Sequence, residues 1–291
     1  MVTVLLSGGL GNQMFQYAAA KSLAARLNTS FSVDMYTFTK KTRATTRSYG
    51  LDTFNIGNIS RSSSLKAKLV TKARPFIQKH REFFQRFGIL TDTYAILYQP
   101  VFETISGNII LSGYFQNERY FKGISGDLGE DFSFKPPLAG KNLEIATELG
   151  KNQSVAIHIR RGDYLDVNSQ SNFITLDKAY YERAIKHIIN RVDTPVFYVF
   201  SEDFDWIKGN LDFGDFPVAF IDWNKGKDSY IDMQLMSLCK HNIIANSSFS
   251  WWGAWLNACP DKIVIAPGQW FRDEYKNVLL DDFFPQGWNK I

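Results

Sequence analysis

The stretch of residues 155–164 constrains the fold most, because a strand pattern runs directly into a cluster of polar side chains. Two sets of residues alternate along it with the period of an extended chain, Val155, Ile157 and Ile159 against Ala156, His158 and Arg160. His158 and Arg160 therefore share one face, and Gly162 ends the strand just before Asp163. Ligands bind at the carboxyl ends of strands in open α/β sheets. The pattern predicts a ligand site there, with a salt-bridge cluster at the sheet end as the alternative.

A glycine-rich turn follows the first predicted strand, Thr3–Ser7, and precedes an alanine-rich helix and a second strand, Phe31–Met35. This order predicts an α/β domain. The turn lacks the Lys-Ser/Thr of a Walker loop and the third glycine of the dinucleotide fingerprint. Its glycines allow close approach of a ligand to the backbone, and its amides offer hydrogen bonds; a plain turn is the alternative. The candidate contacts are Gly9, Gly11, Asn12 and Gln13.

A second polar turn lies between the short predicted strand 242–245 and an apolar helix. It is built of N-capping residues, and helix N-termini bind phosphate through their N–H groups and the helix dipole. Together with Arg160, such a helix end can neutralise a pyrophosphate without a metal ion. The candidate residues of this turn are Asn246, Ser247, Ser248, Phe249 and Ser250.

Three further carboxylates admit two interpretations each. Asp232 lies at the rim of the apolar face of a predicted helix, residues 228–240. It is either a solvated acid or an acceptor for a purine base or ribose. Asp203 and Asp205 form the Asp-x-Asp pattern of metal-dependent sugar transferases, but they follow a strand where helix-capping residues are expected. We favour the capping role and predict no metal site.

The second half of the chain repeats strands and helices in a rhythm that predicts a mostly parallel sheet. Gly150 ends a predicted helix, Leu138–Leu149, so we expect domains at residues 1–150 and 151–291. Cys239 and Cys259 match no metal or disulfide spacing, which predicts reduced thiols. The start resembles no signal peptide and no apolar run is long enough to span a membrane, so a cytoplasmic protein is expected.

A basic segment interrupts the first half. Residues 61–87 hold eight basic side chains and the single acid Glu82, a net charge of +7, whereas the whole chain has only +4. Nucleic-acid binding is therefore not expected. We predict an inserted pair of short helices near residues 61–88, kinked at Pro75. An apolar stripe runs along them, Leu65, Leu69, Phe76, Phe83 and Phe87. Either the stripe packs on the first domain, or it lies peripherally against anionic lipid at the inner face of a membrane.

Four motifs in this order and spacing resemble glycosyltransferase family 11, the alpha-1,2-fucosyltransferases. They occupy residues 8–18, 113–118, 158–164 and 246–256. The resemblance implies a GT-B-like fold of two facing α/β domains with mostly parallel sheets. It also implies metal-independent inverting transfer of L-fucose from GDP-beta-L-fucose, a co-substrate. The acceptor would be the 2-hydroxyl of a terminal beta-galactoside in an oligosaccharide, and no cofactor is implied.

The resemblance also implies roles for individual residues. Arg160 would hold the beta-phosphate of GDP, His158 would contact the nucleotide, and Asp232 would bind guanine or ribose. Ser247 and Ser248 would bind the phosphates, and the 8–13 turn would face the reacting sugars.

The general base is left open between Asp163, Glu118 and Asp166, and Asp163 could instead hold Arg160 in place. Two other functions also stay open. One is another nucleotide-sugar transferase of the same architecture. The other is a carbohydrate-binding protein without turnover, suggested only by the aromatic content of 15%.

Overall fold

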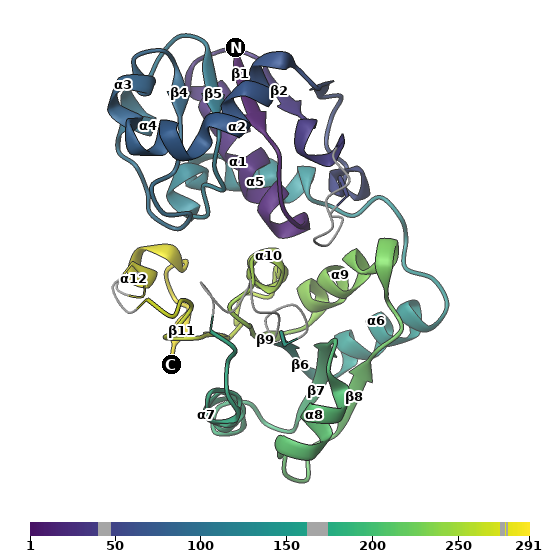
Figure 1. Cartoon of the computed structure of the whole chain (residues 1–291). Coiled ribbons are helices and arrows are strands. Elements are labelled where there is room, and N and C mark those ends of the chain that lie inside the picture. The colour runs from purple at the N-terminus through teal and green to yellow at the C-terminus, as the bar shows by residue number, and fades with distance from the viewer. Residues whose placement is uncertain (40–47, 162–173, 274–276, 278) are drawn as a thin grey trace. The chain divides into compact units, whose positions relative to one another are not determined.

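The computed structural model describes residues 1–39, 48–161, 174–273, 277 and 279–291, which form two compact units (Figure 1). The first unit is Met1–Lys135 with Asp281–Phe283, and the second is Pro136–Leu280 with Phe284–Ile291. The division thus falls before the expected boundary near residue 150. The reason is α6 (Lys141–Lys151), whose residue Leu149 is buried in the core of the second unit.

The first unit has a parallel sheet of five strands in the order β3-β2-β1-β5-β4. The strands are β1 (Val2–Leu5), β2 (Phe31–Asp34), β3 (Ser60–Ser62), β4 (Ile89–Leu90) and β5 (Ile109–Leu111). Val2 of β1 pairs with Phe31 of β2 on one side and with Ile109 of β5 on the other. The predicted order of strand, glycine turn, helix and strand is confirmed.

The helices of the first unit lie between these strands in the sequence, except for the last, which follows β5. They are α1 (Leu10–Arg26), α2 (Leu65–Lys79), α3 (Arg81–Gln85), α4 (Val101–Thr104) and α5 (Ser125–Asp131). The alanine-rich face of α1 is buried throughout its middle, since small side chains let the helix lie close to the sheet.

The basic segment forms two helices, as predicted, but they do not separate at Pro75. Pro75 lies inside α2, and the helix continues through it to Lys79. The chain breaks instead at His80, whose φ of −116° and ψ of 35° are not helical. A proline inside a helix removes one N–H donor, but it does not force a break when the flanking turns are held by packing.

The packing interpretation of the apolar stripe is also wrong. Its residues Leu65, Leu69, Phe76, Phe83 and Phe87 are all exposed. The helix instead buries a neighbouring face, through Ala67, Val70 and Ile77. The segment therefore has two apolar faces. The face with the smaller side chains packs into the core, and the face with the larger ones is exposed.

The second unit has a parallel sheet of six strands in the order β11-β10-β9-β6-β7-β8. The strands are β6 (Gln153–Ile159), β7 (Pro195–Ser201), β8 (Val218–Ile221), β9 (His241–Ile243), β10 (Val264–Ala266) and β11 (Asn289–Lys290). Its further helices are α7 (Lys178–Ile189), α8 (Phe204–Asn210), α9 (Tyr230–Leu238) and α10 (Ser248–Trp255). The predicted parallel sheet is confirmed.

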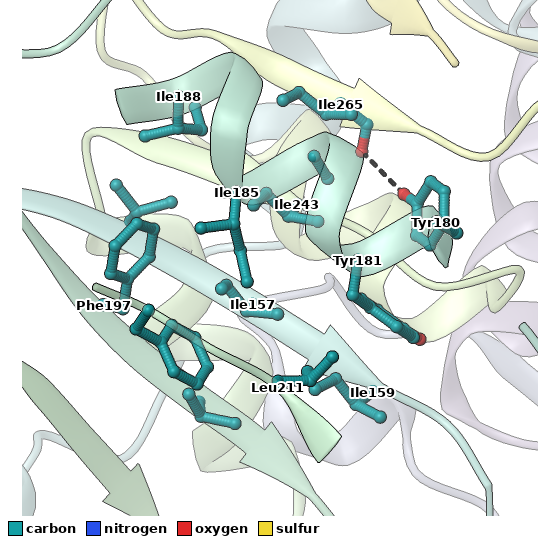
Figure 2. Close-up of a cluster of buried hydrophobic side chains, with 14 of the residues drawn as sticks. Ile157, Ile159, Tyr180, Tyr181, Ile185, Ile188, Phe197, Leu211, Ile243 and Ile265 are labelled. Atoms are coloured by element: carbon teal, nitrogen blue, oxygen red, sulfur yellow. Dashed lines mark hydrogen bonds between the residues drawn. The ribbon is translucent and has the colours of Figure 1, made fainter. Parts of the chain in front are cut away.

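The predicted alternation along β6 is confirmed by the core on its two faces. Ile157 and Ile159 pack with α7 and β7 on one face, as Figure 2 shows. Tyr180 of α7 belongs to the same cluster and donates its phenolic hydrogen to the carbonyl oxygen of Ile244 at 2.6 Å. Ala156 belongs to the other face, in a separate cluster with Leu235 of α9.

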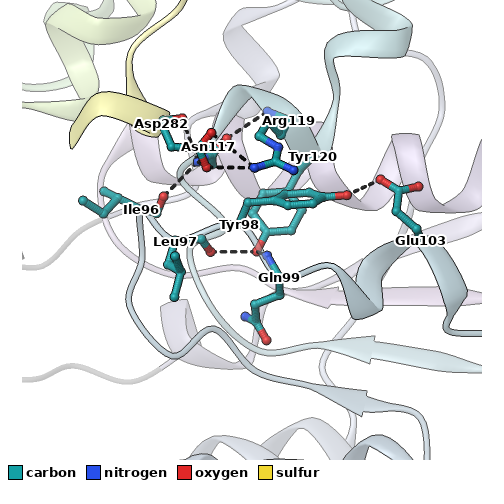
Figure 3. A network of polar contacts seen from close by, with 9 residues as sticks. All are labelled: Ile96, Leu97, Tyr98, Gln99, Glu103, Asn117, Arg119, Tyr120 and Asp282. Atoms are coloured by element: carbon teal, nitrogen blue, oxygen red, sulfur yellow. Dashed lines mark hydrogen bonds and ion pairs between the residues drawn. The ribbon is translucent and has the colours of Figure 1, made fainter. Parts of the chain in front are cut away.

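The C-terminal region contributes α12 (Leu280–Phe283), most of which groups with the first unit. The buried Asn117 donates through Nδ2 to the carbonyl oxygens of Ile96 and Asp282, at 3.0 Å each (Figure 3). Arg119 makes an exposed ion pair with the Asp282 carboxylate at 3.1 Å. Residues far apart in the sequence thus complete one unit.

Candidate active site

Both sheets have a topological switch point beside their first strand. In the second unit β6 lies between β7 and β9, and in the first unit β1 lies between β2 and β5. The chain moves outward on one side of the first strand and then returns to its other side. Loops that leave the carboxyl ends of these strands diverge and leave space for a ligand. The four sequence motifs lie after β1, β5, β6 and β9, which places them at the two switch points.

His158 is the second-last residue of β6, and Arg160 follows directly after the strand, at its carboxyl end. His158 is nearly buried, and its ring centroid lies 5.9 Å from that of Phe249 in α10. Nη1 of Arg160 lies 4.0 Å from Oε1 of the exposed Glu202, so this contact is a weak one. Asp163 and Asp166 lie outside the described residues.

Arg161 is engaged differently. Its Nε donates to Oδ2 of Asp203 at 3.0 Å, and its guanidinium carbon lies 4.0 Å from the centroid of the Trp206 ring. Oδ1 of Asp203 also accepts from the backbone N–H of Trp206 at 3.2 Å. The predicted N-cap role of Asp203 is thereby confirmed. The side chain of Arg161 contacts the N-terminal end of α8. Asp205 is an exposed residue of the first turn of that helix.

In the described part of the chain, no three His, Cys, Asp or Glu side chains are grouped so that they could hold a metal ion. What the described residues offer an anion is arginine and a helix N-terminus.

Hydrogen bonds of two buried side chains position the N-terminus of α10. Asn246 is fully buried and donates through Nδ2 to the carbonyl oxygens of Ile174 at 2.8 Å and Trp270 at 3.1 Å. Ser247 is the N-cap, and its Oγ accepts from the N–H of Phe249 at 3.3 Å. The arrangement orients the first turn of α10 at the carboxyl edge of the sheet.

The predicted ligand residues of this turn therefore divide into two groups. Asn246, Ser247 and Ser250 are buried and are used mainly to shape the turn. Ser248 and Phe249 are partly exposed and lie in the first turn of α10, at the positive end of the helix dipole; the N–H of Phe249 donates to Oγ of Ser247.

Helices α9 and α10 pack side by side because Gly253 removes a side chain from their contact. A Cβ at that position would lie 3.0 Å from Cβ of Met236 and 3.3 Å from its sulfur. Each helix follows one strand of the parallel sheet and precedes the next, so both begin at the carboxyl edge. Asp232, in the first turn of α9, and Ser248 of α10 therefore belong to the same edge.

Asp232 is part of an amide network that the sequence did not predict. Its Oδ1 accepts from Nδ2 of Asn224 at 2.8 Å. Asn224 and Asn142 exchange two amide hydrogen bonds, of 2.9 and 3.0 Å, and Nε1 of Trp223 donates to Oδ1 of Asn142 at 2.8 Å. Burial raises the pKa of Asp232 to about 7, against a smaller opposing effect of the Asn224 hydrogen bond.

The glycine turn of the first unit is stabilised by Gln13, which is fully buried. Nε2 of Gln13 donates to the carbonyl oxygens of Gly8 at 3.0 Å and Ser48 at 2.9 Å, and its Oε1 accepts from the N–H of Gly50 at 2.9 Å. Both N–H groups of its amide are thus taken up by the backbone, and its oxygen accepts one backbone hydrogen bond, so Gln13 shapes the turn.

The neighbouring residues of the turn are placed differently. A Cβ at Gly9 would meet no atom within 4 Å, so the backbone there borders open space. Oδ1 of the partly exposed Asn12 accepts from Nε2 of Gln116 at 2.7 Å, which ties the loop after β1 to the loop after β5. Glu118 follows in the partly exposed 3-10 turn Glu118–Tyr120. Gly11 is buried inside the first turn of α1.

Asp92 is a second residue that the sequence did not single out. It follows β4, is 3% exposed at its side chain, and accepts from Nη2 of Arg74 at 2.9 Å and from the N–H of Tyr114 at 2.6 Å. A Cβ at Gly113 would lie 2.5 Å from its carboxyl carbon. The carboxylate therefore supports the loop after β5 from beneath. No strand before Asp92 was predicted from the sequence, so no local signal pointed to it.

Two solved structures resemble most of the chain. NodZ alpha-1,6-fucosyltransferase co-crystallized with GDP superposes with a TM-score of 0.53 at 12% identity, over 92% of this chain and 96% of that one. FUT1 of Arabidopsis thaliana, in complex with GDP, gives 0.52 at 12% identity, over 90% and 69%. These likenesses confirm the predicted fold of two parallel-sheet α/β units of the GT-B type.

Relatives in sequence come from bacteria and animals. An alpha-1,2-colitosyltransferase of Escherichia coli is 33% identical over 100% of this chain and 99% of its own length. The O-antigen biosynthesis glycosyltransferase WbnK of Escherichia coli is 34% identical over 95% and 97%. Human galactoside alpha-(1,2)-fucosyltransferase 1 is 26% identical over 61% of this chain and 48% of its own length. The model of glycosyl transferase family 11 matches residues 1–291, and the chain belongs to that family.

Proposed function

We propose that this protein transfers L-fucose from GDP-beta-L-fucose to the 2-hydroxyl of a terminal beta-galactoside, with inversion and without a metal ion. The observation that supports the proposal is that Arg160 and the N-terminus of α10 follow the neighbouring parallel strands β6 and β9, at the switch point of the second unit. The names of the family 11 relatives support alpha-1,2 transfer, and structural neighbours bind GDP in their crystals.

The second unit would bind the donor. Arg160 offers a planar, permanently charged fork to the beta-phosphate, and the first turn of α10 offers N–H groups to the same oxygens. The Asp232 carboxylate would accept hydrogen bonds from guanine or ribose, and the Asn142–Asn224 pair would fix its orientation. His158, beside Phe249, would contact the nucleotide.

The reaction is a single displacement. The acceptor oxygen bonds to C1 of fucose while the bond from C1 to the phosphate oxygen breaks, and the electron pair of that bond stays on GDP. Arg160 and α10 stabilise the negative charge that develops there, an effect whose loss typically costs about 10²–10³ in rate. The acceptor proton passes to a carboxylate, for which Asp163, Glu118 and Asp166 are the candidates.

The identity of the sugar needs its own test, because a relative that matches the whole chain is named for colitose transfer. We propose fucose as the first choice and an activated colitose as the second. Purified protein is incubated with either activated sugar and a set of beta-galactosides, and products are identified by mass spectrometry and NMR. We expect an alpha-1,2-fucosyl product. Faster transfer of colitose would reverse the choice, and absence of transfer from either donor would favour a carbohydrate-binding protein without turnover.

Metal independence is tested separately. We expect the rate with GDP-fucose to change by less than about twofold in EDTA, because arginine and a helix N-terminus supply the positive charge. Loss of activity in EDTA with recovery on adding Mn²⁺ would instead favour a role for Asp203 and Asp205 as ligands.

A further inference from the structure

The surface formed by α2, α3 and Phe87, which we call the α2–α3 surface, exposes large apolar side chains. Of the nine such side chains exposed in the described part of the chain, five lie here. They are Leu65 at 71%, Leu69 at 59%, Phe76 at 58%, Phe83 at 56% and Phe87 at 63%. Single exposed apolar residues are ordinary, but a contiguous group marks a contact surface.

These side chains are contiguous. Leu65, Leu69 and Phe76 stand at positions i, i+4 and i+11 of α2, which share one face of a helix. The phenylalanine rings continue this line from α2 into α3. The ring centroid of Phe84 lies 5.9 Å from that of Phe76 and 5.3 Å from that of Phe83. Phe83 in turn lies 5.1 Å from Phe87.

The surroundings of this line are strongly positive. Arg61 and Arg74 are paired with Asp52 and Asp92. Six more basic side chains make no ion pair with any described residue: Lys66, Lys68, Lys72, Lys79, Arg81 and Arg86. Lys68 and Lys72 are one turn apart on α2, in a row beside the apolar line. A second copy of the chain would set these like charges against one another, whereas an anionic surface would neutralise them.

We propose that the α2–α3 surface binds the headgroup region of anionic phospholipid membranes. The leucine and phenylalanine side chains would enter the boundary between headgroups and acyl chains, and the lysine and arginine side chains would contact the phosphates. Among the residues that the structure describes, no helix is long and apolar enough to cross a membrane. The contact is therefore peripheral and depends on ionic strength.

The same helix is attached to the loop after β5. Arg74 and Gln78 of α2 donate to the Asp92 carboxylate and carbonyl oxygen, at 2.9 and 3.1 Å, and Asp92 accepts from the N–H of Tyr114. The membrane surface and one switch-point loop of the first unit are thus joined through a single buried carboxylate. If the proposed fucosyl transfer holds, this connection suits a galactoside acceptor presented on a lipid; membrane binding itself does not depend on that function.

The test is flotation of the full chain with vesicles, without donor or acceptor. Vesicles of phosphatidylcholine with about a third phosphatidylglycerol are compared with phosphatidylcholine alone, from low to high salt. We expect binding to the anionic vesicles that falls as salt rises. The triple change Lys66→Gln, Lys68→Gln and Lys72→Gln should weaken it by up to about a hundredfold, near fivefold for each charge at the surface. Phe76→Ser with Phe83→Ser should weaken it at every salt concentration.

Control variants remove the same number of lysines and of exposed large apolar side chains elsewhere. Lys122→Gln, Lys135→Gln and Lys151→Gln remove the same charge from exposed positions, and Leu143→Ser with Leu238→Ser removes exposed apolar side chains of the second unit. Binding should survive both control sets. No binding of the natural chain at low salt, or equal losses in test and control variants, would overturn the proposal. Two other outcomes would also overturn it. One is that the surface only mediates self-association, seen by sedimentation without lipid, and the other is that it binds nucleic acid instead of lipid.

A second readout separates this proposal from the proposed function. Transfer to a soluble galactoside should be unchanged in the α2–α3 variants, while transfer to a galactosyl lipid in anionic vesicles should fall. Vesicle binding without any transfer would leave the membrane surface standing and the fucosyl transfer refuted.

Discussion

Burial raises the pKa of Asp232 to about 7, so this carboxyl titrates within the ordinary pH range. In the unfolded chain it would titrate near 3.9. Because the folded pKa is the higher one, the folded state favours the neutral acid. The unliganded protein should lose stability as the pH rises from about 4 through 7, and Asp232→Asn should remove that loss. Thermal unfolding of both proteins across this range measures the difference, and parallel curves would contradict it.

Ligand binding should follow the opposite sign. Hydrogen bonds from guanine or ribose require the ionised carboxylate, so GDP affinity should rise with pH. With a pKa near 7, the affinity at pH 5.5 should be about 30-fold below its value at pH 8.5. Calorimetry of GDP binding measures this in the natural protein and in Asp232→Asn. The phosphate of GDP titrates equally with both proteins. Only the additional pH dependence of the affinity of the natural protein is therefore due to Asp232. Absence of any excess would remove Asp232 from the nucleotide site.

The two consecutive arginines offer a matched pair at the same scale. Arg160→Lys should lower kcat about 10²-fold, because one ammonium cannot replace a bidentate fork on phosphate. Arg161→Lys should be milder in kcat and should instead lower the melting temperature, because it weakens the contacts with Asp203 and Trp206. Steady-state kinetics and thermal unfolding separate the effects. Equal activity of Arg160→Lys and the natural protein would end the assignment.

At the scale of elements, the loop between β1 and α1 contains two neighbouring glycines that are under different structural constraints. Gly8 has a φ of +80°, and a Cβ there would lie 2.5 Å from Nδ2 of Asn12. Gly8→Ala should therefore destabilise the fold by about 1–2 kcal/mol or more. Gly9 has an ordinary φ and borders open space.

Gly9→Ala should consequently leave the melting temperature unchanged. If a sugar occupies that space, the new methyl group should reduce kcat/KM about tenfold or more by displacing it. Unchanged kinetics for Gly9→Ala would show that the space above the turn is not used by a substrate.

The sequence predicted these elements well where one periodic signal was present. The alternation along β6 and the turns after β1 and β9 were placed correctly, because side-chain period and capping are local properties. The α2 segment was misread because it carries two apolar faces, and the larger side chains marked the wrong one as buried. Pro75 was given too much weight, since packing of Val70 and Ile77 holds the helix on both sides of it.

At the scale of the molecule, prediction failed where partners are far apart in sequence. Asn142 and Asn224 meet across 82 residues, and no local pattern announces such a pair. The boundary near residue 150 was placed after α6 because a glycine ended the predicted helix, whereas packing of that helix decides to which unit it belongs. Asn117 and Asp282, 165 residues apart, are a further example.

The contact of Asn117 with α12 gives a prediction at this scale. Asn117→Ala would leave two carbonyl oxygens without their donor, so we expect a loss of about 2–4 kcal/mol in the free energy of unfolding. Arg119→Ala removes only the exposed ion pair with Asp282 and its contact over the Tyr98 ring, and should cost less than about 1 kcal/mol. Urea unfolding of the two variants measures the ratio. Equal costs would mean that the buried amide does not hold α12 in place.

The membership of Asp281–Phe283 in the first unit has a consequence for biosynthesis. Residues 136–280 are synthesised after the first 135 residues and before Asp281. The first unit therefore lacks most of α12 while the second unit is being made. Domains generally fold as they emerge, at about 5–20 residues per second. For about 7 to 30 seconds at these rates, the amide of Asn117 can donate to the carbonyl oxygen of Ile96 but not to that of Asp282. We expect the nascent first unit to be more accessible to chaperones and proteases until α12 has been made.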